Sequence, residues 1–361
     1  MSGEARFVRR EAERVLRANW REGTSRDGRP YAYTCPDARK YPHAWLWDSL
    51  MHARAWAAID PARALEELRT LARAQEPDGH IGHTVFWARP VQAMRAPIYN
   101  LQRLRDMSTR TIQPPFLGLV WSEVADAVGD ERVAAEGRSV VGRHHHWLRR
   151  ERAAPDGLLD VIQPDETGLD ASPVFERALG MRAHGRLGWP LVVIASRRHR
   201  FSLRRIRAHG GFTATCPLVN TAWALSHLGL ARLGVPAARE EARRITAALV
   251  ARLWDARAGI FRTAGPDGAW LPGHSWSGLA PLSLPDLPPE VAARLVEEQL
   301  ADPRRFWPRH PVPSMSMADP GFRRDDVGRL VPRYWQGPSW PFTPPFVIPG
   351  LVRRGRADLA E

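Results

Sequence analysis

The chain has 361 residues, of which 44% are hydrophobic, and a formal net charge of +13. It is long enough for a large core, and it has neither a run of about 18 apolar residues nor an apolar stretch behind its charged N-terminus. These features argue against a membrane-spanning protein and against an N-terminal signal peptide. We therefore expect a cytoplasmic protein.

The first strong helical pattern follows the N-terminal helix predicted over 4–19. Residues 44–59 are apolar on two sides, which is typical of a helix that is buried nearly all round. Asp60 can cap the next helix and Pro61 suits its first turn. That second helix has one apolar stripe, formed by Leu65, Leu68 and Ala72, so we expect it to lie outside the first.

The pairing of an inner with an outer helix recurs along the chain. The further pairs are 113–128 with 131–150, 217–233 with 236–254, and 276–284 with 289–300. Shorter helices are predicted over 172–181 and 336–352, and no alternating segment of useful length predicts a strand. The irregular spacing argues against a linear repeat array. The fold class predicted is therefore all-α, an (α/α)6 barrel or six-hairpin toroid.

The helix count bears on completeness. We count about eleven helices against the twelve that six hairpins need, and residues 355–361 resemble the first turn of a further outer helix. We therefore expect a single domain, 1–361, that forms a barrel incomplete at its C-terminus.

Basic residues and cysteines suggest no special partner. Lys40 is the only lysine, so the charge reflects general use of arginine, and the arginine-rich stretch 197–207 is interpreted as a solvated helix face or loop. Binding of nucleic acid through it is a weaker alternative. Cys35 and Cys216 lie far apart without a metal-binding motif, which predicts two buried free thiols. We predict no metal and no cofactor.

The chain contains fifteen tryptophans. Indole rings pack on the C–H faces of sugars and can donate a hydrogen bond to a hydroxyl. We expect Trp56, Trp147, Trp223 and Trp254 to be core residues. Trp335 and Trp340, which stand among turn residues, are as well explained by a substrate platform as by the core.

Carboxylates are densest between Gln163 and Pro173. Asp165, Glu166 and Asp170 lie within six residues, with Gly168 between them. Cleavage of a glycosidic bond needs one carboxylic acid to protonate the leaving oxygen and a second carboxylate to act on water or carbon. The alternative is that Asp170 caps the following helix and its neighbours are solvated.

Four motifs in order identify a resemblance that covers residues 41 to 352. They are Tyr41-Pro-His-Ala-Trp-Leu-Trp-Asp-Ser49, Ile112-Gln-Pro-Pro115, Glu166-Thr-Gly-Leu-Asp-Ala-Ser-Pro173 and Arg333-Tyr-Trp-Gln-Gly-Pro-Ser-Trp340. Together they resemble the inverting (α/α)6-barrel glycosidases that include mannosylglycerate and glucosylglycerate hydrolases and processing α-glucosidases.

The resemblance implies an α-glycosidase that acts on a small glucoside or mannoside. It implies that Asp170 is the general acid and that Glu166 binds sugar. The remaining substrate-binding residues that it implies are Trp45, Trp47, Asp48, Gln113, Tyr334, Trp335, Gly337 and Trp340. An alternative for Asp48 is a structural role as a buried helix residue bonded to a neighbouring loop.

The chain departs from the family pattern at three points. Asp165 and Ala171 stand where tryptophan and asparagine are common, which leaves the preferred sugar open. The general base of the family is a glutamate beyond the Tyr334–Trp340 loop and the helices after it, a region that this sequence does not reach. The base is therefore not identified in this chain, and Asp319, Asp325 and Asp326 are the better internal candidates, ahead of Glu123 and Glu166.

Two other functions remain open. One is a non-catalytic or truncated barrel that binds sugar without cleaving it. The other is a sugar epimerase, which would use histidines as acid and base, with His80, His83 and His274 as candidates. His144, His145 and His146 are consecutive on an outer helix and are expected at the surface. The oligomeric state is left open.

Overall fold

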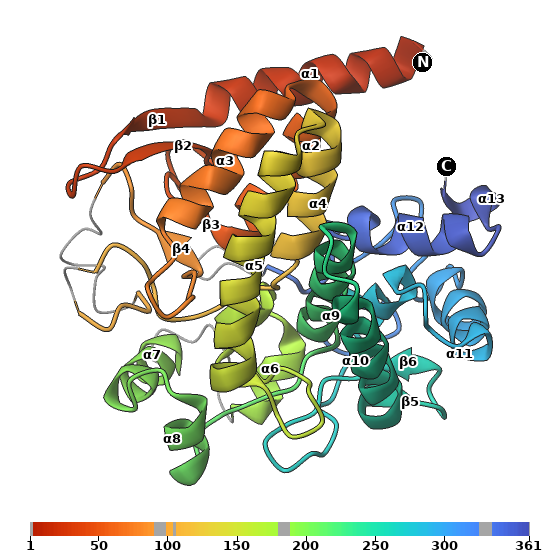
Figure 1. Ribbon diagram of the computed structural model, residues 1–361. Coiled ribbons are helices and arrows are strands. Elements are labelled where there is room, and N and C mark those ends of the chain that lie inside the picture. The colour runs from red at the N-terminus through yellow and green to blue at the C-terminus, as the bar shows by residue number, and fades with distance from the viewer. Residues whose placement is uncertain (1–2, 90–98, 104–105, 180–187, 325–333, 361) are drawn as a thin grey trace. The chain divides into compact units, whose positions relative to one another are not determined.

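The computed structural model describes residues 3–89, 99–103, 106–179, 188–324 and 334–360 (Figure 1). Helix makes up 51% of the structure, in agreement with the predicted helical class. The chain forms two compact units. Unit 1 comprises 1–150 and 225–240, and unit 2 comprises 151–224 and 241–361.

Unit 1 carries the predicted pair of buried and one-sided helices. Its elements are α1 (Gly3–Asn19), β1 (Trp20–Thr24), β2 (Pro30–Thr34), β3 (Ala44–Trp45), α2 (Leu46–Ile59), α3 (Pro61–Arg73), β4 (Thr84–Val85), α4 (Leu117–Val128) and most of α5 (Glu131–Arg152). Helix α2 packs against α3 and α4 (Figure 1), and Leu46, Leu50 and Trp56 on it are fully buried.

The boundary between α2 and α3 follows from local chemistry. The Asp60 side chain accepts a hydrogen bond from the Arg63 backbone N–H, and Pro61 occupies the first turn of α3. A proline has no backbone N–H, and in the first turn that N–H would have no intrahelical acceptor, so no helical hydrogen bond is lost. Leu65 and Leu68 are buried on α3 as predicted, whereas Ala72 is only half-buried.

Unit 2 consists of shorter elements. They are η2 (Pro164–Thr167), α6 (Pro173–Ala178), α7 (Gly188–Arg198), α8 (Leu203–Ala208), β5 (Trp254–Asp255), β6 (Ile260–Phe261), η3 (Trp276–Gly278), η4 (Ala280–Ser283), α11 (Pro289–Arg294), η5 (Leu295–Leu300), α12 (Pro344–Arg353) and α13 (Ala357–Ala360). The chain passes between the units within α9 (Pro217–Arg232) and α10 (Ala237–Leu253). Helix α12 packs on η4.

Several expectations about elements need correction. Strands β1 and β2 form an antiparallel hairpin where no strand was predicted. Helix α4 begins at Leu117 rather than Gln113, and α12 begins at Pro344 rather than Gln336, because prolines and tight turns occupy the residues before them. The segment 276–284 is two 3₁₀ turns instead of one helix. A helix was predicted over 172–181, and the structure has α6 there, which ends at Ala178. Met181 lies outside the described residues.

The prediction that three consecutive histidines of α5 face solvent is wrong for two of them. His144 and His145 are buried, and His146 is exposed. The His144 Nδ1 lies 3.3 Å from the Gly79 carbonyl oxygen, and the His145 Nε2 lies 2.8 Å from Ser226 Oγ. Neighbouring segments cover α5 on two sides, so two consecutive positions are both buried.

Other predictions about the interior are confirmed. Cys35 and Cys216 are buried and free. Trp56, Trp147 and Trp223 are buried, whereas Trp254 is half-buried. In the arginine-rich stretch, Arg204, Arg205 and Arg207 are exposed on α8 above the buried side chains of Phe201, Leu203 and Ile206. Within the part of the chain that the structure describes, no helix is long and apolar enough to cross a membrane.

Candidate active site

The predicted site residues fall into two groups, one in each unit. The first, which we call the Trp-Asp group, consists of Trp45, Trp47, Asp48 and Gln113 of unit 1. The second consists of Glu166, Asp170, Tyr334, Trp335, Gly337 and Trp340 of unit 2.

The Trp-Asp group lies where the short strand β3 enters α2. The Trp47 backbone N–H donates to Gln113 Oε1 at 2.9 Å, and the Leu46 N–H donates to the His83 carbonyl oxygen at 2.9 Å. Gln113 therefore satisfies a backbone donor that the first turn of the helix leaves without an intrahelical acceptor. This bond brings two motifs that are 66 residues apart into direct contact.

Asp48 follows in the first turn of α2 and is half-buried. Burial raises the pKa of Asp48 to about 7, against the opposing effect of the neighbouring His52. Burial disfavours the charged form of a carboxyl group, while a nearby cation favours it. Asp48 is thus a perturbed acid among tryptophans, a combination that is typical of binding and catalytic sites.

The carboxylate-rich loop of unit 2 is built around a 3₁₀ turn. Thr167 Oγ1 donates to the Pro164 carbonyl oxygen at 2.7 Å and accepts from the Leu169 N–H at 3.0 Å. Gly168 has a left-handed backbone, with φ of 72°, which a glycine adopts without steric cost. The 3₁₀ turn ends at Thr167, and the half-buried Asp170 follows it, three residues before α6 begins.

Glu166 is fully buried in this loop. One of its carboxylate oxygens accepts from Arg152 Nη2 at 2.9 Å, and the other accepts from the Ile162 N–H at 2.8 Å. Arg152 is also buried, and its second terminal nitrogen donates to the Phe201 carbonyl oxygen at 3.0 Å. Glu166 therefore fixes the shape of the loop that carries Asp170.

The Tyr334–Trp340 loop is made of stacked aromatic rings. The Trp335 and Trp340 rings are 4.7 Å apart between centroids and nearly parallel, and Tyr334 meets Trp340 edge-on at 5.8 Å. Trp335 is buried, whereas Tyr334 and Trp340 are half-buried. Trp335 has φ of 62°, which is strained for a bulky residue and is often retained at functional positions.

Within unit 2, one contact joins this aromatic loop to the Asp170 loop and another joins it to Ser314. Gln336 Nε2 donates to the Ala171 carbonyl oxygen at 3.2 Å. Gly337 donates its N–H to Ser314 Oγ at 2.9 Å, and a Cβ at Gly337 would overlap the Arg323 carbonyl oxygen. Gly337 thus lets the backbone pass closely, while Gln336 holds the aromatic loop beside Asp170.

The other carboxylates proposed as bases are engaged in local structure. Both oxygens of Asp319 accept backbone N–H groups, from His274 at 2.9 Å and from Gly321 at 2.7 Å. Glu123 forms an ion pair with Arg54 at 2.7 Å. Asp325 and Asp326 lie outside the described residues.

The histidines considered for an epimerase are dispersed between the units. His80 and His83 are buried in unit 1, where they pack on Trp147 and Trp45 respectively. His274 belongs to unit 2 and is half-buried. Across the described ranges, no group of three histidine, cysteine or acidic side chains has an arrangement that could hold a metal ion.

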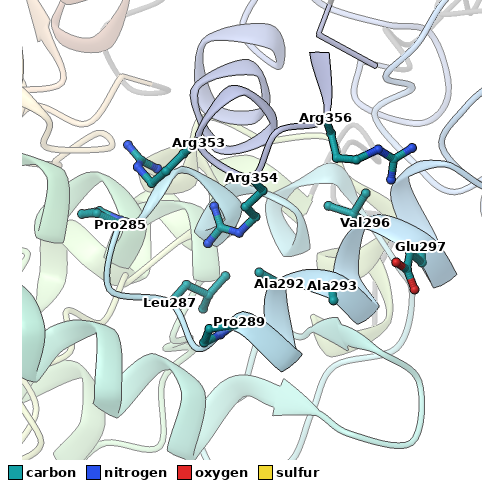
Figure 2. A pocket seen from close by; sticks show the side chains of 10 residues that line it. All are labelled: Pro285, Leu287, Pro289, Ala292, Ala293, Val296, Glu297, Arg353, Arg354 and Arg356. Carbon is teal, nitrogen blue, oxygen red and sulfur yellow. The ribbon is translucent and has the colours of Figure 1, made fainter. Parts of the chain in front are cut away.

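A pocket of about 350 Å³ in unit 2 lies elsewhere, beside α11 and α12 (Figure 2). Arg353, Arg354 and Arg356 line it, and all three guanidinium groups have local partners. Arg353 donates to the Ser283 carbonyl oxygen at 3.0 Å. Arg354 donates to the Leu282 carbonyl oxygen at 3.0 Å, and Arg356 pairs with Asp358 at 2.8 Å. The lining includes none of the predicted site residues, so this pocket is not the candidate active site.

Sequence reasoning missed three polar residues behind these groups: His52, Glu67 and Arg152. His52 is four residues after Asp48, and Glu67 lies on the buried side of α3. A charged residue within an apolar helical stripe was the available signal for Glu67. For Arg152 the sequence offered no such signal, because only the fold of the chain between the two residues brings Arg152 to Glu166.

Comparison with known proteins identifies the class. A crystal structure of the mannosylglycerate hydrolase from Thermus thermophilus in complex with Tris and D-glycerate superposes with a TM-score of 0.82, at 25% identity, over 98% of this chain and 89% of that one. The fold is thus that of a glycoside hydrolase.

Sequence relatives define the family more closely. The mannosylglycerate hydrolase of Rubrobacter radiotolerans is 27% identical over 97% of this chain and 86% of its own length. Mannosylglycerate hydrolase MGH2 of Selaginella moellendorffii is 28% identical over 91% of this chain and 73% of its own length. The chain belongs to the family of mannosylglycerate hydrolase MGH1-like glycoside hydrolase domains, which matches residues 41–361.

Proposed function

We propose that the protein hydrolyses the α-glycosidic bond of mannosylglycerate or glucosylglycerate with inversion, with Asp170 as the general acid. We further propose that residues 1–361 belong to a single domain of the (α/α)6-barrel class. The observation that carries the proposal is the contact of Gln336 with Ala171, which holds the aromatic loop beside Asp170 in a member of this glycosidase family.

In the proposed reaction, Asp170 donates its proton to the glycosidic oxygen as the bond to the anomeric carbon breaks. A water molecule attacks that carbon from the opposite face and loses a proton to a carboxylate base. The products are glycerate and a sugar whose anomeric configuration is inverted. Asp170 is half-buried, so it combines access to a ligand with a defined position.

Exposure separates the proposed substrate contacts from their supports. Asp48 and the ring of Trp45 are half-buried in unit 1, and the rings of Tyr334 and Trp340 are half-buried in unit 2. We propose each of them as a sugar contact on the surface of its own unit. Carboxylates accept hydrogen bonds from sugar hydroxyls, and aromatic rings cover the C–H faces. Trp47, Gln113, Glu166, Trp335 and Gly337 are buried and shape the substrate contacts from behind.

The test is incubation of the protein with mannosylglycerate, glucosylglycerate and α-linked disaccharides, followed by proton NMR. The anomeric signal of the first product formed reports inversion directly. Asp170→Asn is expected to reduce turnover by about a hundredfold to ten-thousandfold, since it removes the proton donor. Asp267→Asn, which changes an exposed aspartate of the same unit, is the matched control and is expected to be fully active.

Other outcomes would redirect the assignment. Release of a sugar with retained configuration would contradict inversion, and full activity of Asp170→Asn would contradict its role as the acid. Binding of a glycerate glycoside without any product, at high protein concentration, would favour the non-catalytic sugar-binding alternative.

A further inference from the structure

A chain of polar side chains runs through unit 1 behind Asp48. His52 lies four residues after Asp48 on α2, so the two side chains share one face of the helix. The His52 Nδ1 is 3.5 Å from Glu67 Oε1 on α3. The Glu67 Oε2 accepts from Thr34 Oγ1 at 2.9 Å, and Thr34 Oγ1 in turn accepts from Trp56 Nε1 at 2.9 Å.

Glu67 is held rigidly at the inner end of this chain. Its side chain is 0% exposed, and Thr34 and Trp56 are buried as well. Burying a carboxylate is costly unless it is hydrogen-bonded or paired with a cation. Thr34 fixes one of the Glu67 oxygens, and the other faces His52. The arrangement therefore favours a protonated imidazole in the space between Glu67 and Asp48.

The groups that shift the pKa of His52 lie on α2, α3 and β2. Burial by itself would lower the pKa of His52, but the Glu67 carboxylate, Asp48 and a hydrogen bond with the Thr34 backbone outweigh it, and the pKa is raised. Asp48 is affected in the opposite sense. Burial raises the pKa of Asp48, the His52 cation lowers it, and Glu67 adds a smaller increase.

We infer that His52 is a positioning residue for Asp48: held by Glu67 as an imidazolium, it favours the ionised form of Asp48 and orients it to accept hydrogen bonds from the hydroxyls of the bound sugar. The inference rests on the proposed function for its sugar ligand. The charge relation between the three side chains can be tested without turnover.

The chemistry explains why a histidine is suited to this position. An ionised acceptor forms shorter and stronger hydrogen bonds with hydroxyls than a neutral carboxyl group does. Burial raises the pKa of Asp48 to about 7, and a nearby cation favours the ionised form that accepts these hydrogen bonds. Removing that cation leaves the same side chain in place with a larger protonated fraction at a given pH.

The direct test is NMR of protein that carries ¹³C-carboxyl aspartate, with the Asp48 signal identified by its loss in Asp48→Asn. His52→Asn is expected to move the titration midpoint of Asp48 upward by about one pH unit, equivalent to a tenfold change in proton affinity. The midpoint should also move in His52→Gln. His146→Asn, which changes an exposed histidine of the same unit, should leave it unaltered. An unmoved midpoint in both His52 variants would overturn the inference.

The pH dependence of kcat/KM supplies the second readout. In His52→Asn the acidic limb should move to higher pH, so that kcat/KM falls about tenfold near pH 6 and recovers as the pH rises. A purely structural role predicts an equal loss at all pH values, and that outcome would reject the inference. If the parent protein shows no turnover, the proposed function fails, while the Asp48 titration still decides the role of His52.

Discussion

At the scale of single residues, the buried ion pair of Arg152 with Glu166 makes the sharpest stability prediction. The two side chains are 1% and 0% exposed. Arg152→Met removes the cation from a site where water cannot replace it, and we expect the free energy of unfolding to fall by about 3–5 kcal/mol. Urea denaturation measures this directly.

A double-mutant cycle separates the pair from its surroundings. Because Glu166→Gln removes the opposing charge, the double variant should be more stable than the sum of the two single losses predicts. The matched control is Arg232→Met, whose ion pair with Asp126 is exposed, and its cost should be within about 1 kcal/mol. An equal decrease in the free energy of unfolding for Arg152→Met and Arg232→Met would show that the buried ion pair contributes no more to stability than the exposed one.

The residues behind the site also show where sequence reasoning reached its limit. Spacing and resemblance predicted the residues in the motifs, and the structure places Trp47 with Gln113 and the Asp170 loop with the aromatic loop. Glu67 and His52 meet only because α3 folds back on α2. That register depends on packing between elements, which local periodicity does not specify.

At the scale of elements, the close approach of α4 to the part of α9 in unit 1 depends on two glycines. The Gly118 N–H donates to Ser226 Oγ at 2.9 Å, and a Cβ on Gly229 would overlap the Gly118 backbone. Gly229→Ala must therefore push the helices apart, and we expect a loss of about 1–3 kcal/mol in the free energy of unfolding.

The control for this substitution lies on α5. Gly142 has open space where a Cβ would stand, so Gly142→Ala should raise stability by roughly 0.5–1 kcal/mol through helix propensity alone. Thermal unfolding of the two variants should shift in opposite directions. Similar shifts would mean that the close approach of the helices is not what requires glycine.

Element types were predicted better than element boundaries. The apolar patterns of 44–59 and 217–233 predicted helices that the structure contains as α2 and α9. The β1–β2 hairpin escaped notice because β1 is exposed or half-buried throughout and β2 buries three consecutive residues, so neither strand has the alternation that signals a strand. The buried histidines of α5 were misplaced because a charged helix was assumed to be covered on one side only.

At the scale of the whole molecule, the helical class and the family followed from the sequence, while the division into two compact units did not. The first two motifs lie in unit 1 and the last two in unit 2, but the chain returns to unit 1 at residues 225–240 before the last motif. A return of this kind depends on long-range contacts, which hydrophobic periodicity does not report. The net charge of +13 likewise indicated little about function, because arginines such as Arg54, Arg69 and Arg152 form ion pairs within the protein.

The response of the whole protein to acid follows from its buried histidines. Burial lowers the pKa of His43 and of His144 from an ordinary 6.5 to about 4, and it lowers the pKa of His145 as well. Between about pH 6.5 and 4 the unfolded chain binds protons at these positions and the folded protein does not, so stability must fall as the pH decreases through this range. Each full shift of this size corresponds to about 3 kcal/mol.

The raised pKa values of His52 and Asp48 act in the opposite direction, because a group with a raised pKa stabilises the fold at low pH, and they offset part of the loss caused by the three buried histidines. We therefore expect the urea midpoint to decrease steadily from about pH 7 to about pH 4.5. His144→Gln should reduce the slope of that decrease, since the variant has no imidazole to protonate, whereas His146→Asn on the exposed side of α5 should retain it. An identical slope in both variants would assign the acid sensitivity to carboxylates rather than to the buried histidines.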